Sequence, residues 1–362
     1  MQRKRVLYSK GAVCRWARGR PTCLSVLFWL AAAPGLAHAA DRYAGMCQPE
    51  ARSRIYNPQG TMLWGTRQDW DPAAAPDERQ SVMVSVGLEK PVRGPARALE
   101  LREGRLLPVA PGAGASLDGT VLRGSSSSGQ PVEVAICGAE PVAGDGGGYV
   151  RYRIQAWNPV AGTWENPCAR TSAVGDPRAL AVDGVWDGSG VRRDVRGKFT
   201  FACENGAIAK CVGWGYSPWS SREGQPLAEL HQACTRMARA DYCGDGRSHT
   251  VQGTMIDIYD TLGVQKADAR STALANAFEA TWSVDGATCL AATRSGQPLD
   301  AVLRECPARF EWKEMDLGGG DRCLARRTGE EHPDARLRTR IIPHAPPASG
   351  QHMPPPRPRA GL

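Results

Sequence analysis

The cysteines constrain this chain more than any other feature, because their chemistry depends on the compartment in which it folds. The first 20 residues are basic, residues 23–33 are apolar, and residues 37–39 read Ala-His-Ala. This order is typical of a secretory signal peptide. We therefore predict a signal peptide over residues 1–39 and a secreted or periplasmic protein. The apolar run is shorter than the roughly 20 residues that cross a bilayer, so we expect no membrane span after signal removal.

Ten of the twelve cysteines follow this segment. An even number in an oxidising compartment predicts up to five disulfides, whose connectivity a sequence does not determine. Our preferred pairing links Cys203 and Cys211 to Cys234 and Cys243. The full set of disulfide candidates is Cys47, Cys137, Cys168, Cys203, Cys211, Cys234, Cys243, Cys289, Cys306 and Cys323.

The basic charge of the chain is concentrated at its ends. The formal net charge is +8, yet residues 1–20 carry seven basic groups and residues 326–362 carry a surplus of four, so the residues between them are slightly acidic. A nucleic-acid-binding protein needs basic charge on its folded body. We therefore expect no nucleic-acid partner.

Composition divides the rest of the chain into three regions. Residues 40–196 are rich in Gly and Pro and contain alternating, strand-like runs at 81–87 and 149–157. Residues 197–325 hold most of the cysteines and the clearest local patterns. Residues 326–362 are rich in Pro and Arg and are predicted to be disordered. The expected fold class is α+β, β-rich and disulfide-stabilised, with at least one packed amphipathic helix.

Local patterns place four elements in the third quarter of the chain. Asn205-Gly206 between two apolar-patterned runs predicts a β-hairpin over 198–215. Apolar residues spaced by three and four predict a helix over 226–240, with Cys234 on its buried face. Alternation predicts a strand over 253–260, and residues 271–282 are expected to be helical.

A family resemblance rests on several motifs in order. Residues 230–243 read LHQACTRMARADYC and are followed by GDGRSHTVQGTMIDIYD, with FTFACENGAIAKCVGWGYSPW before them at 199–219 and FEATWSVDGATC after them at 278–289. These segments resemble the ADYC domain family of secreted bacterial proteins, named for the tetrapeptide that stands here at 240–243. The resemblance covers about 197–290. It implies a secreted protein with a domain beginning near 197, and it implies no activity, cofactor or partner.

Two constellations were weighed as chemical sites. Asp241, His249 and Asp257 provide carboxylates and an imidazole within twenty residues, which a hydrolase could use for acid–base chemistry. Each also has a structural explanation, as a helix end, a turn or a strand edge, and neither GxSxG nor HExxH occurs in the chain. His231, Cys234, Cys243 and His249 could ligate zinc, but their spacing matches no common zinc module and the oxidising compartment favours disulfides. We expect neither catalysis nor a cofactor.

A third group of residues suggests binding. Trp214, Tyr216 and Trp219 lie close together in GWGYSPW, where their rings could stack on a sugar or anchor a protein, or could fill the core. The expected function is a non-catalytic structural or recognition protein of the cell envelope or extracellular space, with an envelope protein, an extracellular protein or a glycan as partner. The alternatives are a secreted hydrolase using residues 241–260 and an aromatic carbohydrate-binding module.

Overall fold

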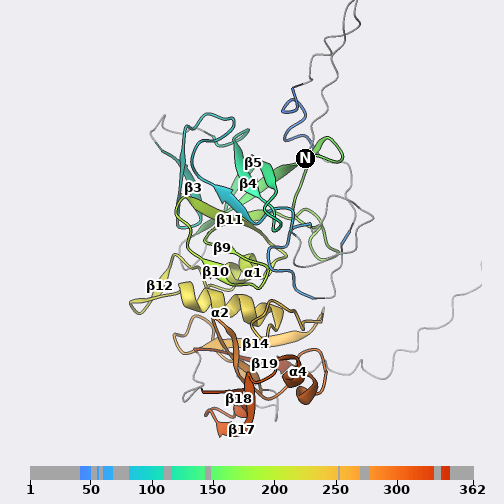
Figure 1. The fold of residues 1–362 in the computed structure, drawn as a ribbon. Coiled ribbons are helices and arrows are strands. Elements are labelled where there is room, and N and C mark those ends of the chain that lie inside the picture. Colours follow the sequence, from blue (N-terminus) through green and yellow to red (C-terminus); the bar gives the residue numbers. More distant parts are fainter. Residues whose placement is uncertain are drawn as a thin grey trace, which may run out of the picture. The chain divides into compact units, whose positions relative to one another are not determined.

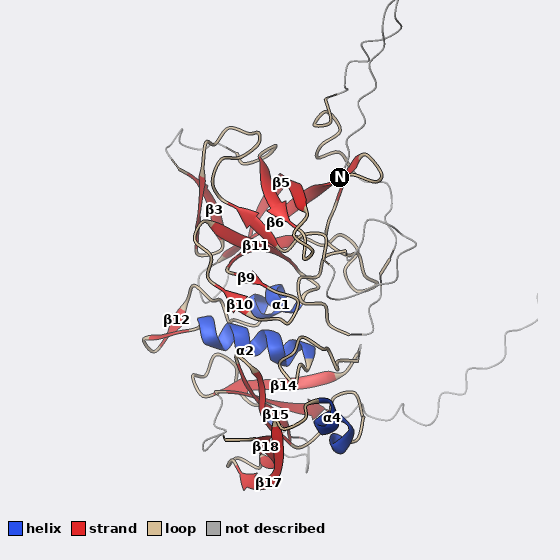
Figure 2. Cartoon of the chain, in the orientation of Figure 1, coloured by secondary structure: helices blue, strands red, loops and turns tan. Residues whose placement is uncertain are grey.

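The computed structural model describes residues 41–49, 55–56, 60–67, 81–109, 116–142, 148–251, 253–269, 278–329 and 336–342. The predicted signal peptide lies outside these residues. Most of the described elements are strands, and the helices α1, α2 and α4 stand among them (Figure 2). This confirms the expected fold class.

The bounds of the elements follow the chain as coloured in Figure 1. The helices are α1 (Ala207–Gly213), α2 (Ala228–Arg239) and α4 (Leu299–Glu305). The strands are β1 (Ser85–Gly87), β2 (Leu99–Arg102), β3 (Arg105–Pro108), β4 (Val121–Ser125), β5 (Pro131–Val142), β6 (Tyr149–Asn158), β7 (Thr163–Glu165), β8 (Ala179–Asp183), β9 (Val185–Trp186), β10 (Arg192–Arg193), β11 (Lys198–Cys203), β12 (Ser221–Arg222), β13 (Gln225–Pro226), β14 (Met255–Asp260), β15 (Phe278–Ser283), β16 (Gly286–Leu290), β17 (Phe310–Asp316), β18 (Arg322–Arg327) and β19 (Leu337–Ile342).

The first large sheet has the order β5-β4-β1-β11-β8-β6-β7. Because β5 also pairs with β6, six of these strands close into a ring. Their inward side chains form a core that includes Val86, Ile136, Tyr152, Phe199 and Phe201. Strand β11 begins after the predicted boundary at 197 but pairs with β1 and β8 from before it, so that boundary does not separate two sheets.

The second large sheet has the order β14-β19-β15-β16-β18-β17 and is antiparallel throughout. Helix α2 contacts β15, β16 and β19 of this sheet as well as α1, and α1 contacts β8 and β11 of the first sheet. The two helices therefore share one hydrophobic core with both sheets, and this core includes Leu180, Ile208, Leu230, Met237 and Trp282. Among the described residues, none of the helices has the length and apolarity that crossing a membrane requires.

The predicted helix over 226–240 is confirmed by α2. It ends where Ala240 adopts a left-handed conformation with φ 50°, and Cys234 is buried as expected. The predicted strands over 149–157 and 253–260 correspond to β6 and β14. Of the run 81–87, only Ser85–Gly87 is a strand.

The hairpin predicted at Asn205-Gly206 is wrong, because the second run forms α1 instead of a strand. Gly206 has φ −89°, whereas a tight type I′ turn needs positive φ. A Cβ at Gly206 would lie 2.5 Å from the backbone nitrogen of Gly65. This glycine therefore allows a distant segment of backbone to approach closely, and the local pattern does not reveal that contact.

Two further expectations are corrected. Residues 278–282 belong to strand β15, because pairing with β16 and β19 buries both faces of this segment and overrides its local helical pattern; residues 271–277 lie outside the described ones. Within the predicted disordered tail, Leu337–Ile342 forms β19 between β14 and β15. Its arginines misled the prediction, since Arg338 and Arg340 both form ion pairs with the buried Asp321.

All ten cysteines of the described region form disulfides. The pairs are Cys47–Cys137, Cys168–Cys203, Cys211–Cys234, Cys243–Cys306 and Cys289–Cys323. The preferred pairing is right for Cys211 with Cys234, which joins α1 to α2. It is wrong for Cys203 and Cys243, whose partners lie in segments that the local pattern did not connect to them. Five disulfides fit a protein that folds in an oxidising compartment.

Candidate functional site

The tetrapeptide at 240–243 is a structural junction at the end of α2. Asp241 is buried and accepts a hydrogen bond from Nη1 of Arg236 at 2.6 Å, as part of an ion pair in which both side chains are almost fully enclosed. The same carboxylate accepts the backbone N–H groups of Asp245 and Gly246 at 3.1 and 3.0 Å. Because the buried charge is paired and its oxygens are hydrogen-bonded, Asp241 orders the turn after α2.

Tyr242 occupies the centre of a second buried network. Its hydroxyl donates to Oε1 of Glu279 at 2.9 Å and accepts the backbone N–H of Arg294 at 2.8 Å. The Arg294 guanidinium forms two hydrogen bonds to the Glu279 carboxylate, at 3.0 and 2.8 Å. Burial raises the pKa of Tyr242, and the neighbouring Glu279 adds to the rise, so the hydroxyl stays protonated. Its ring stacks on Trp282 at 5.4 Å, which ties α2 to strand β15.

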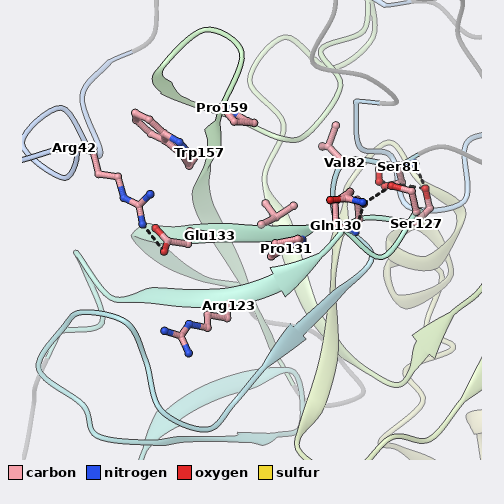
Figure 3. Close-up of a pocket in the computed structure, with 13 residues that line it drawn as sticks. Arg42, Ser81, Val82, Arg123, Ser127, Gln130, Pro131, Glu133, Trp157 and Pro159 are labelled. Carbon is pink, nitrogen blue, oxygen red and sulfur yellow. Dashed lines mark hydrogen bonds and ion pairs between the residues drawn. The ribbon is translucent and has the colours of Figure 1, made fainter. Parts of the chain in front are cut away.

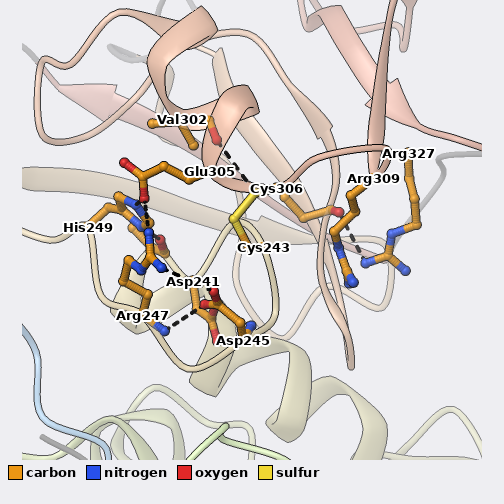
Figure 4. The surroundings of a disulfide bond; sticks show 12 residues. Asp241, Cys243, Asp245, Arg247, His249, Val302, Glu305, Cys306, Arg309 and Arg327 are labelled. Carbon is orange, nitrogen blue, oxygen red and sulfur yellow. Dashed lines mark hydrogen bonds and ion pairs between the residues drawn. A yellow bond between two sulfur atoms is a disulfide. The ribbon is translucent and has the colours of Figure 1, made fainter.

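His249 meets a carboxylate, but not one of the predicted ones. Its Nε2 lies 3.1 Å from Oε2 of Glu305, and its Nδ1 lies 3.1 Å from the carbonyl oxygen of Ala240 (Figure 4). Burial works to raise the pKa of Glu305, but hydrogen bonds from His249 and Arg247 outweigh it and lower that pKa, so the carboxylate is ionised. Both ring nitrogens therefore face acceptors, which only the doubly protonated imidazolium can satisfy. Such a ring has no lone pair with which to act as a base.

The predicted catalytic set does not assemble. Asp241 pairs with Arg236 and Asp257 accepts the backbone N–H of Asp268 at 3.0 Å, while His249 pairs with Glu305. The sequence missed Glu305 because it lies 56 residues from His249 and comes near it through α4, which the Cys243–Cys306 disulfide anchors.

The candidate zinc ligands are also engaged elsewhere. Cys234 and Cys243 are in different disulfides, and Nε2 of His231 donates to the carbonyl oxygen of Ile208 at 3.1 Å. Burial lowers the pKa of His231 to about 3, so its ring is neutral. In the described part of the chain, no three His, Cys, Asp or Glu residues gather in a way that could hold a metal ion.

The three rings of GWGYSPW do not form an exposed platform. Tyr216 is fully buried and its hydroxyl donates to Oδ2 of Asp260 at 3.0 Å. Trp219 is only partly exposed and its ring packs against Gly104, while Trp214 packs against the main core. The rings fill space between elements, which is the commoner role of aromatic side chains.

A groove of about 740 Å³ lies instead across the outer face of β4, β5 and β6 (Figure 3). Arg123 on β4 is directly opposite Glu133 on β5, and Trp157 follows on β6. Since side chains on neighbouring strands share a face in register, these three residues form a row across the sheet. The serine turn 126–128, Gln130 and Pro131 complete one end of the groove, and Pro159 lies beside Trp157.

Charge in the groove is partly neutralised. Arg42 donates to Oε1 of Glu133 at 2.6 Å, and its guanidinium carbon lies 5.8 Å from the centroid of the Trp157 ring. Disulfide Cys47–Cys137 fastens the turn that carries Arg42 to β5. Arg123 is exposed and forms no ion pair with any described residue, so the groove has one positive charge available to a ligand.

Sequence reasoning missed the groove because none of its residues forms a local motif. Trp157 was read only as part of an alternating strand, and that alternation does place it on the face opposite the buried Ile154 and Ala156. Its neighbours Arg42 and Glu133 lie 115 and 24 residues away along the chain. Only strand pairing and the disulfide bring them together.

Comparison with known proteins gives one match. Neither the curated proteins nor the solved structures include one that matches the chain. The model of the ADYC domain family matches residues 114–296, and so begins well before 197, where the resemblance was expected to start. It includes strands β4 to β6 of the groove as well as the junction after α2. Because this match covers half of the sequence, the chain belongs to the ADYC domain family.

Proposed function

We propose that this protein is an exported, non-catalytic recognition protein that binds an acidic oligosaccharide in the groove across β4, β5 and β6. The observation that carries the proposal is the row formed by Arg123, Glu133 and Trp157, with a half-exposed indole ring beside hydrogen-bonding groups. The five disulfides support export, because such bonds persist in oxidising compartments.

The chemistry of the row suits a sugar. The apolar face of a pyranose ring can stack on an indole such as Trp157, whose own partners Arg42 and Trp164 hold it in place. Sugar hydroxyls can both donate and accept, so they match the carboxylate of Glu133, the amide of Gln130 and the hydroxyls of the serine turn. Arg123 supplies the unpaired cation that a carboxylate-bearing sugar would neutralise.

The hydrolase alternative has less support. It required His249 to meet Asp241 or Asp257, and those carboxylates hold other partners. The carbohydrate-binding alternative is retained at a different place on the molecule, since the aromatic residue now proposed to stack on the sugar is Trp157 rather than the GWGYSPW group.

A glycan array probed with the mature protein tests the proposal. We expect acidic oligosaccharides to be retained and Trp157→Ala to lower their affinity at least ~10-fold, as loss of a central aromatic contact does. Trp312→Ala is the matched control, because Trp312 is 64% exposed on β17, outside the groove. Arg123→Ala should weaken binding of acidic glycans selectively, whereas Arg196→Ala, another exposed arginine, should not.

The thermal midpoint of each variant shows whether it is folded. Retention of no glycan, or equal loss of binding in the Trp157 and Trp312 variants, would show that the groove does not bind sugars.

A further inference from the structure

Lys210 is an unusual residue in the core between the helices. It lies in the last turn of α1, where every other residue from Ala207 to Val212 is buried. Its own side chain is largely enclosed, and it forms no hydrogen bond or ion pair within the described part of the chain. Burial lowers the pKa of this ammonium, and no neighbouring charge offsets that effect. A buried cation without a counter-charge is costly, so its presence calls for an explanation.

Lys210 lines a cavity of about 300 Å³ that is separate from the groove. Most of the wall is apolar, with Met62, Val174, Trp214 and Ile256 among its members. Threonine side chains from three segments of the chain, at positions 61, 171, 250 and 254, add hydroxyl groups. This combination of an apolar wall with a few polar groups is typical of small-molecule sites.

The other charged residues of the wall already have partners. Glu204 accepts the backbone N–H of Arg178 at 2.9 Å and a hydrogen bond from Arg151 at 3.3 Å. Arg294 is held by Glu279 through two hydrogen bonds. Lys210 is thus the charge in this cavity that a ligand could neutralise.

We propose that this cavity binds a small organic carboxylate with an apolar body, whose carboxylate pairs with Lys210 while its body lies against Trp214 and Ile256. An enclosed ion pair of this kind is strengthened because little water screens it. The apolar body adds favourable burial, which inorganic anions lack. The site is independent of the glycan groove, and either can be present without the other.

Calorimetric titration of the mature protein with acetate, isovalerate and phenylacetate tests this site. Affinity should rise from acetate to the two larger acids because more apolar surface is buried. Phenylacetamide, which has nearly the same shape without the charge, should bind at least ~10-fold more weakly than phenylacetate.

Two substitutions locate the site. Lys210→Met keeps the length of the side chain and removes the charge, so it should lower phenylacetate affinity at least ~10-fold while leaving the weak binding of phenylacetamide unchanged. Lys313→Met is the matched control, because Lys313 is an exposed lysine on β17 outside the cavity. Loss of a buried unpaired charge should not unfold the protein, and an unchanged thermal midpoint in Lys210→Met verifies that.

A second readout follows the lysine itself. After reductive methylation with 13C-formaldehyde, the Lys210 signal should titrate below the ordinary lysine range, and saturating phenylacetate should raise its pKa. The proposal is overturned if none of the three acids binds, if phenylacetamide binds as tightly as phenylacetate, or if Lys210→Met binds phenylacetate like the parent protein.

Discussion

Replacing Tyr242 by Phe isolates the hydrogen bonds at the centre of the junction after α2. The phenyl ring keeps the volume and the stacking on Trp282, so only the hydroxyl is lost. That hydroxyl donates to the ionised Glu279 and accepts the backbone N–H of Arg294, and all three residues are buried. A hydrogen bond to a charged group contributes about 1.5–3 kcal/mol, and leaving a buried N–H unpaired costs about 1–3 kcal/mol.

We therefore expect Tyr242→Phe to lower the free energy of unfolding by about 2–4 kcal/mol. For a cooperative unit of this size, about 2–4 °C of melting temperature corresponds to each kcal/mol, so the midpoint should fall by at least about 4 °C. The assay is thermal unfolding followed by near-UV circular dichroism with the disulfides intact.

Tyr149→Phe is the control for this substitution. Tyr149 packs against the main core, but its hydroxyl has no hydrogen-bond partner within the described residues, and its removal should change the midpoint by less than about 1 °C. A Tyr242→Phe protein that melts together with Tyr149→Phe would refute the inference that the tetrapeptide contributes a buried polar network.

Two further predictions concern the cysteines and His231. Thiol titration of the denatured, unreduced mature protein should find almost no free sulfhydryl, and peptide mapping should recover Cys211 linked to Cys234; a Cys211–Cys243 peptide would contradict the structure. Burial lowers the pKa of His231 from 6.5 to about 3, so the unfolded chain takes up a proton that the folded one does not as the pH falls between these values. Unfolding free energy should then fall by up to ~1.4 kcal/mol per pH unit in that window, a slope that His231→Gln should reduce. Equal slopes in parent and variant, measured by urea unfolding, would show that His231 titrates normally.

Much of the fold was predictable where a local pattern and the tertiary environment agree. Helix α2 was predicted because its apolar residues recur at helical spacing, and that face is the one buried in the core. Strands β6 and β14 were predicted because one face of each is more buried than the other, which produces alternation. Helix α1 and strand β15 were missed because contacts with distant segments decide their form, through the close approach to Gly65 in one case and burial on both faces in the other.

The candidate sites depended more strongly on tertiary structure. The residues 240–243 were recognised by their sequence, but their roles come from Arg236, Glu279 and Cys306, of which two lie far along the chain. The groove at Trp157 and the cavity at Lys210 were not predicted at all. Each is assembled from single residues of several segments, and such sets leave no periodic or motif-like trace.

The amino-acid sequence by itself determined the even number of cysteines in the chain after its apolar leader, the amphipathic helix and the family, because these depend on composition and on short-range order. Tertiary structure decided which cysteines pair, which carboxylate meets His249 and where an unpaired cation faces a cavity. The physical reason is that disulfides, ion pairs and cavities need atoms a few ångströms apart, and strand pairing and helix packing set those distances between residues tens of positions apart in the chain.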